Sequence, residues 1–330
     1  MLRGFLRKLT FSGFDLTDIK WRAGVLAVVL LYIYLMHVFI GVRPDHFFLC
    51  TLVLVFVFFG REWGRMFLVD WSPFIIFWIA YDSMRGLVDS LRGYIFVFEP
   101  FDLEVKLFGW MTSSTVPAFY FQIFQVEYEG AFIKTALDIF TTTTYLLHFI
   151  APLILGWIFW HTINERRTFY LFAYTFTTLN LMALITFMIL PSAPPWYVFY
   201  YGFEQPSLKF YDSSASLINF DLLIGGNFLQ TFWGTFNSNY FAAIPSLHSG
   251  YPTLIALFIW LRFKGWTWVF VLYPISAWFS AVYLNHHYII DLIIGTLYVG
   301  VAYFIAKKLI LPYVFDRFID YNFGAEVAKE

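Results

Sequence analysis

Two histidines and one aspartate form the strongest chemical pattern in the sequence. His248 follows Pro245 and Ser246 at the start of one apolar segment, and His287 stands at the start of another. Asp291 comes four residues after His287, so a helix places both side chains on one face. A carboxylate that fixes the tautomer of one imidazole, beside a second imidazole, suits phosphoryl transfer through a phosphohistidine. We predict that His287 is the nucleophile and that His248 handles the proton of the leaving group.

The choice of His287 depends on spacing. His286 competes with it, but the residue four positions after His286 is Ile290, which cannot orient an imidazole. A purely structural hydrogen bond between His287 and Asp291 is the alternative to a catalytic pair. A histidine near a membrane segment is costly unless it faces a cavity or a partner, which favours a functional role.

Ser246 is predicted to cap a helix that begins at Leu247. The free amides of the first turn, together with the helix dipole, would then form an anion site for phosphate oxygens. The alternative is an ordinary capped helix whose histidine lies at the level of the lipid headgroups.

The composition indicates a polytopic helical membrane protein. Hydrophobic residues make up 60% of the chain and charged residues 13%, whereas soluble domains carry about 25% charge. The net charge of −1 argues against a nucleic-acid partner. Cys50 is the single cysteine, so we expect no intramolecular disulfide and no thiolate metal site. We also expect no cofactor and no metal, because the other histidines lack carboxylates at metal spacing. These other histidines are His37, His46, His148 and His161. We interpret them as core or interface residues, and His148 is the first of them to consider as an exception with a functional role.

Eight segments are candidate membrane spans. They cover residues 23–42, 46–60, 67–82, 139–160, 168–190, 247–263, 266–284 and 288–310. The second and third are short for a bilayer of about 30 Å, so they are tilted neighbours or a re-entrant pair. Residues 1–22 combine cations with apolar residues at helical spacing, which predicts an interfacial helix rather than a cleaved signal peptide.

The distribution of cations predicts the sidedness. With a cytoplasmic N-terminus and alternating spans, fifteen of the 21 lysine and arginine residues fall in inner gaps and six in outer gaps. Both termini are then cytoplasmic, and His248 and His287 lie at the outer ends of their segments. Two outer segments are long, 83–138 and 191–245. We expect interfacial helices in the first and a functional loop without regular structure in the second.

The motifs resemble those of the type 2 phosphatidic acid phosphatase superfamily. Its second motif reads P-S-G-H, and here Leu247 replaces the glycine. Its third reads S-R-x-x-x-x-x-H-x-x-x-D, which Ser280, His287 and Asp291 match, while Ala281 replaces the arginine. The first motif has no match. The forms F-A-A-I-P-S-L-H, S-A-P-P-W-Y and N-H-H-Y-I-I-D are similar to the inositol phosphorylceramide synthase branch and its prokaryotic relatives, over about residues 80–300.

The resemblance implies an all-α fold with a six-helix core, metal-independent phosphotransfer, and an active site on the luminal or extracellular side. We accordingly expect three parts. Residues 1–62 hold the interfacial helix and two additional spans, residues 63–312 the catalytic core, and residues 313–330 a cytoplasmic tail. Either the plasma membrane or, in a eukaryote, a Golgi-type membrane would hold the protein.

The missing motif arginine leaves the phosphate charge without its usual partner. Arg85 and Arg92 are our candidates, because seven residues place them on one helical face. The alternative is that they pair with Asp82 and Asp89 nearby. Lys209 and His286 are weaker candidates. The substrate pocket is assigned to residues that flank the motifs, although Pro195 and Trp196 also fit a simple loop stop: Pro195, Trp196, Tyr197, His286 and Tyr288.

The predicted function is transfer of a phosphorylated polyol headgroup, inositol phosphate, between two membrane lipids. If water is the acceptor, the same residues make a lipid phosphate or isoprenyl diphosphate phosphatase. A different class is a lipid carrier or scaffold without chemistry, in which substitution of His287 changes no turnover. Donor and acceptor lipids are the expected partners, and the sequence does not determine an oligomeric state.

Overall fold

The computed structural model describes residues 10–11, 14–15, 19–39, 44–91, 93–161, 166–207, 211–237, 239–264 and 267–314. The chain divides into two compact units, residues 1–82 and 83–330. The functional boundary that we expect between residues 62 and 63 stays a prediction. The predicted interfacial helix at the N-terminus falls on residues of which most lie outside the described ranges.

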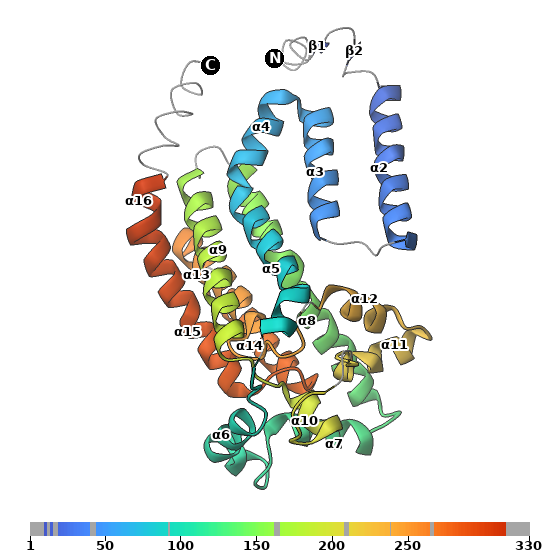
Figure 1. Cartoon of the computed structure of the whole chain (residues 1–330), viewed down its shortest axis with the longest axis vertical. Helices are drawn as coiled ribbons and strands as arrows, with labels where there is room; N and C mark the ends of the chain where they lie inside the picture. The colour runs from blue at the N-terminus through green and yellow to red at the C-terminus, as the bar shows by residue number, and fades with distance from the viewer. Residues whose placement is uncertain are drawn as a thin grey trace. The chain divides into compact units, whose positions relative to one another are not determined.

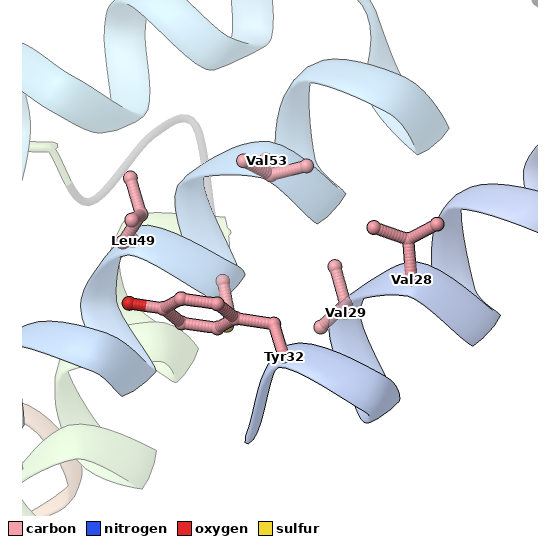
Figure 2. Close-up of a pocket in the computed structure, with 6 residues that line it drawn as sticks. Val28, Val29, Tyr32, Leu49 and Val53 are labelled. Atoms are coloured by element: carbon pink, nitrogen blue, oxygen red, sulfur yellow. The ribbon is translucent and has the colours of Figure 1, made fainter. Parts of the chain in front are cut away.

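The N-terminal unit is mainly helical. It contains the two-residue strands β1 (Thr10–Phe11) and β2 (Phe14–Asp15), which pair antiparallel, and the helices α2 (Ile19–Phe39), α3 (Pro44–Phe59) and α4 (Arg61–Asp70). Helix α5 (Ser72–Leu91) crosses the boundary between the units. Figure 2 shows an apolar pocket between α2 and α3. Its lining offers no acid, base or cation for phosphoryl transfer: Val28, Val29, Tyr32, Leu49, Cys50 and Val53.

The third predicted span was placed wrongly. Residues 67–82 straddle a break, because α4 ends at Asp70 and α5 begins at Ser72. Pro73 has no amide hydrogen to continue the hydrogen-bond ladder of α4, so it suits the first turn of a new helix. The Ser72 hydroxyl donates to the Val69 carbonyl at 2.7 Å and so bridges the break.

The second unit contains a bundle of long helices (Figure 1). Helix α13 contacts α8, α9, α14 and α15, and α9 also contacts α8 and α15. Three of these helices contain an internal proline, which membrane helices tolerate when neighbouring groups satisfy the freed carbonyl. The bundle consists of α8 (Phe132–His161), α9 (Arg166–Ile189), α13 (Leu247–Phe263), α14 (Thr267–Tyr283) and α15 (Ile289–Ile305), which continues through a π-helical turn (Ala306–Ile310) into α16 (Leu311–Val314).

Short helices gather at the end of the bundle where α15 begins (Figure 1). The segment 83–138 contributes α6 (Phe98–Phe108), the 3-10 turn Gly109–Met111 and α7 (Pro117–Glu127). The segment 191–245 was expected to lack regular structure, and this was wrong. It forms α10 (Pro195–Tyr201), the 3-10 turn Ala215–Leu217, α11 (Ile218–Ile224) and α12 (Phe228–Phe236).

Length and composition allow several of these helices to cross a membrane. In the described part of the chain, four segments are long and apolar enough: Ile19–Met36, Phe132–Trp160, Arg166–Ile189 and Ile289–Val314. Shorter apolar helices include Phe48–Phe59, Ser72–Tyr81 and Val271–Tyr283. The helical class is confirmed, whereas the count of eight spans stays a prediction.

Candidate active site

The first turns of α13 and α15 are held together by hydrogen bonds. The Ser249 hydroxyl on α13 donates to the Leu292 carbonyl on α15 at 2.9 Å. The backbone amide of Ser246 donates to the carbonyl of Asp291 at 3.1 Å. These bonds bring together the two sequence motifs that were 39 residues apart at their histidines.

Close approach of the two helices requires a glycine at position 295. A Cβ atom there would lie 2.1 Å from the Ser246 carbonyl oxygen and 2.4 Å from the Ser249 hydroxyl. The contact involves backbone, which cannot rotate away. Gly295 therefore sets the separation of α13 and α15, and with it the separation of the histidines that the helices carry.

Gly295→Ala is expected to push the two helices apart. We expect a loss of about 1–3 kcal/mol in stability, as for other overpacked sites. The loss would appear as a lower thermal unfolding midpoint in detergent. Gly300→Ala on the same helix is the matched control, because a Cβ at Gly300 meets nothing within 4 Å. Equal midpoints for the two variants would contradict this account of the helix contact.

The three predicted catalytic side chains form one chain of hydrogen bonds. The Nδ1 atom of His248 lies 2.9 Å from Nε2 of His287, and Nδ1 of His287 lies 3.2 Å from Oδ2 of Asp291. Asp291 also accepts the Tyr288 amide at 2.9 Å, so it caps α15 while it orients the histidine. Asp291 has no exposed surface and His287 is 5% exposed.

The hydrogen bonds of His287 favour one tautomer of its ring. Burial lowers the pKa of His287 to about 3, so its ring is neutral near pH 7. When Asp291 is ionised, its carboxylate can only accept a hydrogen bond, and in that state Nδ1 of His287 carries the hydrogen and Nε2 holds a lone pair. In that tautomer, the lone pair of Nε2 faces Nδ1 of His248 at 2.9 Å.

The sequence also matches the sequence model of a known protein family. The model described as the PAP2 superfamily matches residues 120–305, which include His248, His287 and Asp291. The chain belongs to the PAP2 superfamily. The resemblance predicted from the motifs is thereby confirmed, and so is the class of helical membrane protein.

Named relatives of this PAP2 chain come from bacteria and fungi. It is 32% identical to the phosphoinositol dihydroceramide synthase of Bacteroides thetaiotaomicron over 82% of this chain and 86% of the relative. It is 36% identical to the inositol phosphorylceramide synthase catalytic subunit of Saccharomyces cerevisiae over 41% of this chain and 34% of that subunit. The inositol phosphorylceramide synthase of Candida albicans is 33% identical over 53% of this chain and 37% of its own length. No solved structure matches.

Aromatic rings surround His248 in the PAP2 site. The Tyr145 ring of α8 stacks on His248 with centroids 4.0 Å apart and planes 9° apart. The His148 ring lies 3.9 Å from His248, and Nδ1 of His148 bonds the Tyr145 carbonyl. Trp233, from α12, lies 5.9 Å from His248 and 5.0 Å from His286. These rings hold the imidazole in place, although His248 as a whole remains partly exposed.

Sequence reasoning did not assign Tyr145 or Trp233 to the site, and it named His148 only as the first exception among the remaining histidines. A signal was present in α8, where Tyr145 and His148 are three residues apart and so share a helical face. Trp233 carried no such signal, since α12 was expected to be loop. His148 is buried as expected, but its ring contacts the reactive cluster rather than the apolar core alone.

The PAP2 site contains buried polar atoms that lack a hydrogen-bond partner within the described structure. They include Nε2 of His248, the Ser246 hydroxyl, Oδ1 of Asp291 and both polar atoms of the Asn285 amide. The predicted cap is therefore only partly right. Ser246 is the N-cap residue of α13, but its hydroxyl caps no amide and has no partner among the described residues.

The predicted pocket residues occupy three different surroundings. Trp196 and Tyr197 are 2% exposed and pack with Tyr211 and Phe241 in an aromatic cluster. The Trp196 amide donates to the Asn285 carbonyl at 3.0 Å, which ties α10 to the segment that carries the histidines.

His286 and Tyr288 lie on either side of His287 in the chain. Nε2 of His286 lies 3.3 Å from the Ser214 carbonyl, and its ring is 4.9 Å from Tyr145. Tyr288 is fully buried beside Val116 and Ile290, and its hydroxyl has no partner in the described structure.

The structure does not describe the side chains of the predicted phosphate-binding arginines. Arg85 lies in α5, but its side chain is outside the described residues, as are Arg92 and Lys209. Among the described residues, no group of three or more histidine, cysteine or carboxylate side chains is placed to hold a metal ion.

Proposed function

We propose that this chain is an integral-membrane phosphotransferase that moves inositol phosphate from one lipid to the hydroxyl of another. The observation that carries the proposal is the hydrogen-bonded series of His248, His287 and Asp291. The names of the relatives support the choice of headgroup, because three of them are inositol phosphorylceramide or phosphoinositol dihydroceramide synthases.

The first step forms a bond between His287 and phosphorus. Nε2 of His287 attacks the phosphodiester of an inositol lipid, and the bond from phosphorus to the lipid alcohol breaks. His248, protonated beforehand, gives its proton to the departing alkoxide, which leaves as diacylglycerol. Asp291 stabilises the positive charge that develops on the His287 ring.

The second step returns His287 to its free state. The acceptor alcohol gives its proton to the now neutral His248 while its oxygen attacks phosphorus. The bond from phosphorus to Nε2 breaks, and the product is an inositol phosphate ester of the acceptor lipid. By analogy with the named relatives, the acceptor is a ceramide or dihydroceramide.

The phosphate oxygens would bind at the start of α13. The unpartnered Ser246 hydroxyl and the first-turn amides supply donors, and the helix dipole adds favourable charge. Arg85 and Arg92 remain our candidates for the cation. Pro195, Trp196, Tyr197, His286 and Tyr288 remain our candidates for the substrate pocket.

Burial of His287, the proposed nucleophile, favours transfer over hydrolysis. A phosphohistidine survives until an alcohol arrives only if water is kept from it. His286 and His287 are 4% and 5% exposed, and Ser246 and Asp291 have no exposed surface. The alternative, a lipid phosphate or isoprenyl diphosphate phosphatase, needs a water at the same place.

An assay of the purified protein distinguishes these functions. The protein in mixed micelles is given phosphatidylinositol labelled in the inositol ring, with and without ceramide, and the lipids are separated by thin-layer chromatography. We expect a new labelled lipid that depends on ceramide, with an equal amount of diacylglycerol. Labelled water-soluble product that is independent of ceramide, with no new lipid, would establish the phosphatase instead.

We also propose that both termini face the cytoplasm and that the site faces the opposite side of the membrane. The excess of cations in the predicted inner gaps supports this orientation. It predicts that Lys264→Cys, between α13 and α14, resists a membrane-impermeant thiol reagent in intact cells of a Cys50→Ser background. Labelling of that cysteine from outside the cell would show that the orientation is the opposite one.

A further inference from the structure

A carboxylate outside the matched PAP2 region reaches the site from α6. Glu104 is the residue, and it has no exposed surface although α6 belongs to the segment before residue 120. Helix α6 contacts α15 at the end of the bundle where α15 begins (Figure 1). None of the three signature motifs includes this position.

Glu104 binds the first turn of α15 with both oxygens. Its Oε1 accepts the Ile289 amide at 2.9 Å, and its Oε2 accepts the Ile290 amide at 3.2 Å. Asp291 accepts the amide just before these, that of Tyr288. Two carboxylates therefore share three consecutive amides, and one of the two also orients His287.

The charge of Glu104 is coupled to that of Asp291. Burial raises the pKa of Glu104 to about 7, the two amides oppose this rise, and the nearby Asp291 adds to it. The titratable groups that face Glu104 are Asp291 and the Tyr288 phenol, both on or beside the start of α15. An ionised Glu104 would act on the cluster as a second negative charge behind Asp291.

We propose that Glu104 is a positioning residue for phosphotransfer. Its carboxylate holds the first turn of α15 so that Asp291 faces Nδ1 of His287. Its negative charge stabilises the cation that forms on His287 during attack. The inference rests on the proposed function, and it adds a requirement for a segment that lies before the matched region.

The test measures kcat and KM for donor lipid from pH 5.5 to 9 in the transfer assay. Glu104→Gln keeps one carbonyl acceptor but removes the charge, and we expect kcat at pH 8 to fall by about 10–100-fold, as for other residues that orient a reactive group. The ratio of wild-type kcat to variant kcat should fall towards one below pH 6, where Glu104 of the wild type is protonated. KM should change by less than about two-fold, because Glu104 touches no substrate in this account.

Two further variants keep the test decisive. Glu99→Gln removes the same charge from an exposed position of α6, where Glu99 accepts the Tyr94 hydroxyl, and should match the wild type at every pH. Glu104→Asp keeps the charge but shortens the reach, so kcat should fall while the amides of residues 289 and 290 exchange hydrogen faster.

Several results would overturn the proposal. They are a wild-type kcat in Glu104→Gln or Glu104→Asp, a loss that is equal at all pH values, or a loss confined to KM. If Glu104→Gln does not purify in folded form, the kcat and amide exchange of Glu104→Asp decide. A wild-type protein without transfer activity would instead reject the proposed function.

Discussion

His287→Gln is expected to lower the rate of lipid headgroup transfer by at least about 10⁴-fold, because glutamine offers no nucleophile for phosphorus. The side chain is similar in size and can still accept or donate a hydrogen bond to Asp291, so the fold should persist. The rate is measured with labelled phosphatidylinositol and ceramide in mixed micelles. If the variant still binds donor lipid but has lost turnover, His287 is needed for catalysis, which a lipid carrier without chemistry would not require.

His286→Gln is the comparison that assigns the nucleophile. Its ring bonds the Ser214 carbonyl rather than a carboxylate, so we expect a loss of less than about ten-fold. The two variants differ by one position in the chain and remove the same group. A larger loss for His286→Gln than for His287→Gln would move the nucleophile to the neighbouring ring. Full activity in both would leave the site without a catalytic role.

His248→Gln is expected to lower transfer by about 10²–10⁴-fold, the usual contribution of a general acid and base. The loss should depend on the leaving group. A phosphodiester with a nitrophenolate leaving group needs no proton, so release of nitrophenol in the first turnover should be nearly normal in this variant. The second step still needs a base, so enzyme that carries the phosphoryl group on His287 should accumulate.

A burst experiment checks the role of His248 as acid in the first step and as base in the second. Wild-type enzyme and His248→Gln are mixed with the nitrophenyl diester, and nitrophenol is followed over the first turnover by stopped flow. A burst of one nitrophenol per active site followed by slow turnover in the variant agrees with His248 as acid and base. Equal losses for natural and activated donors would assign His248 a structural role.

The sequence was sufficient to predict that His248, His287 and Asp291 meet. The spacing of His287 and Asp291, and the place of His248 at the outer end of its apolar segment, predicted one cluster, and their atoms lie within hydrogen-bonding distance. Long apolar runs predicted the helices because only internally bonded backbone is stable in lipid. Helix α13 begins and ends at the predicted residues.

Contacts across long separations could not be predicted in the same way. Glu104 is 185 residues from Ile289, and nothing near it in the chain distinguishes it from the exposed Glu99. The need for a glycine at position 295 comes from a backbone contact with α13, which appears only when both helices are placed. Helices in the segment 191–245 were missed because short helices without a long apolar face resemble loops.

The stereochemical course at phosphorus tests the central claim most directly. A phosphatidylinositol phosphorothioate of one known configuration is converted to product, and the configuration of the product is determined. Two successive in-line displacements, the first by His287 and the second by the acceptor alcohol, predict net retention. Net inversion would mean that the acceptor attacks the donor directly, and the covalent function of His287 would be wrong.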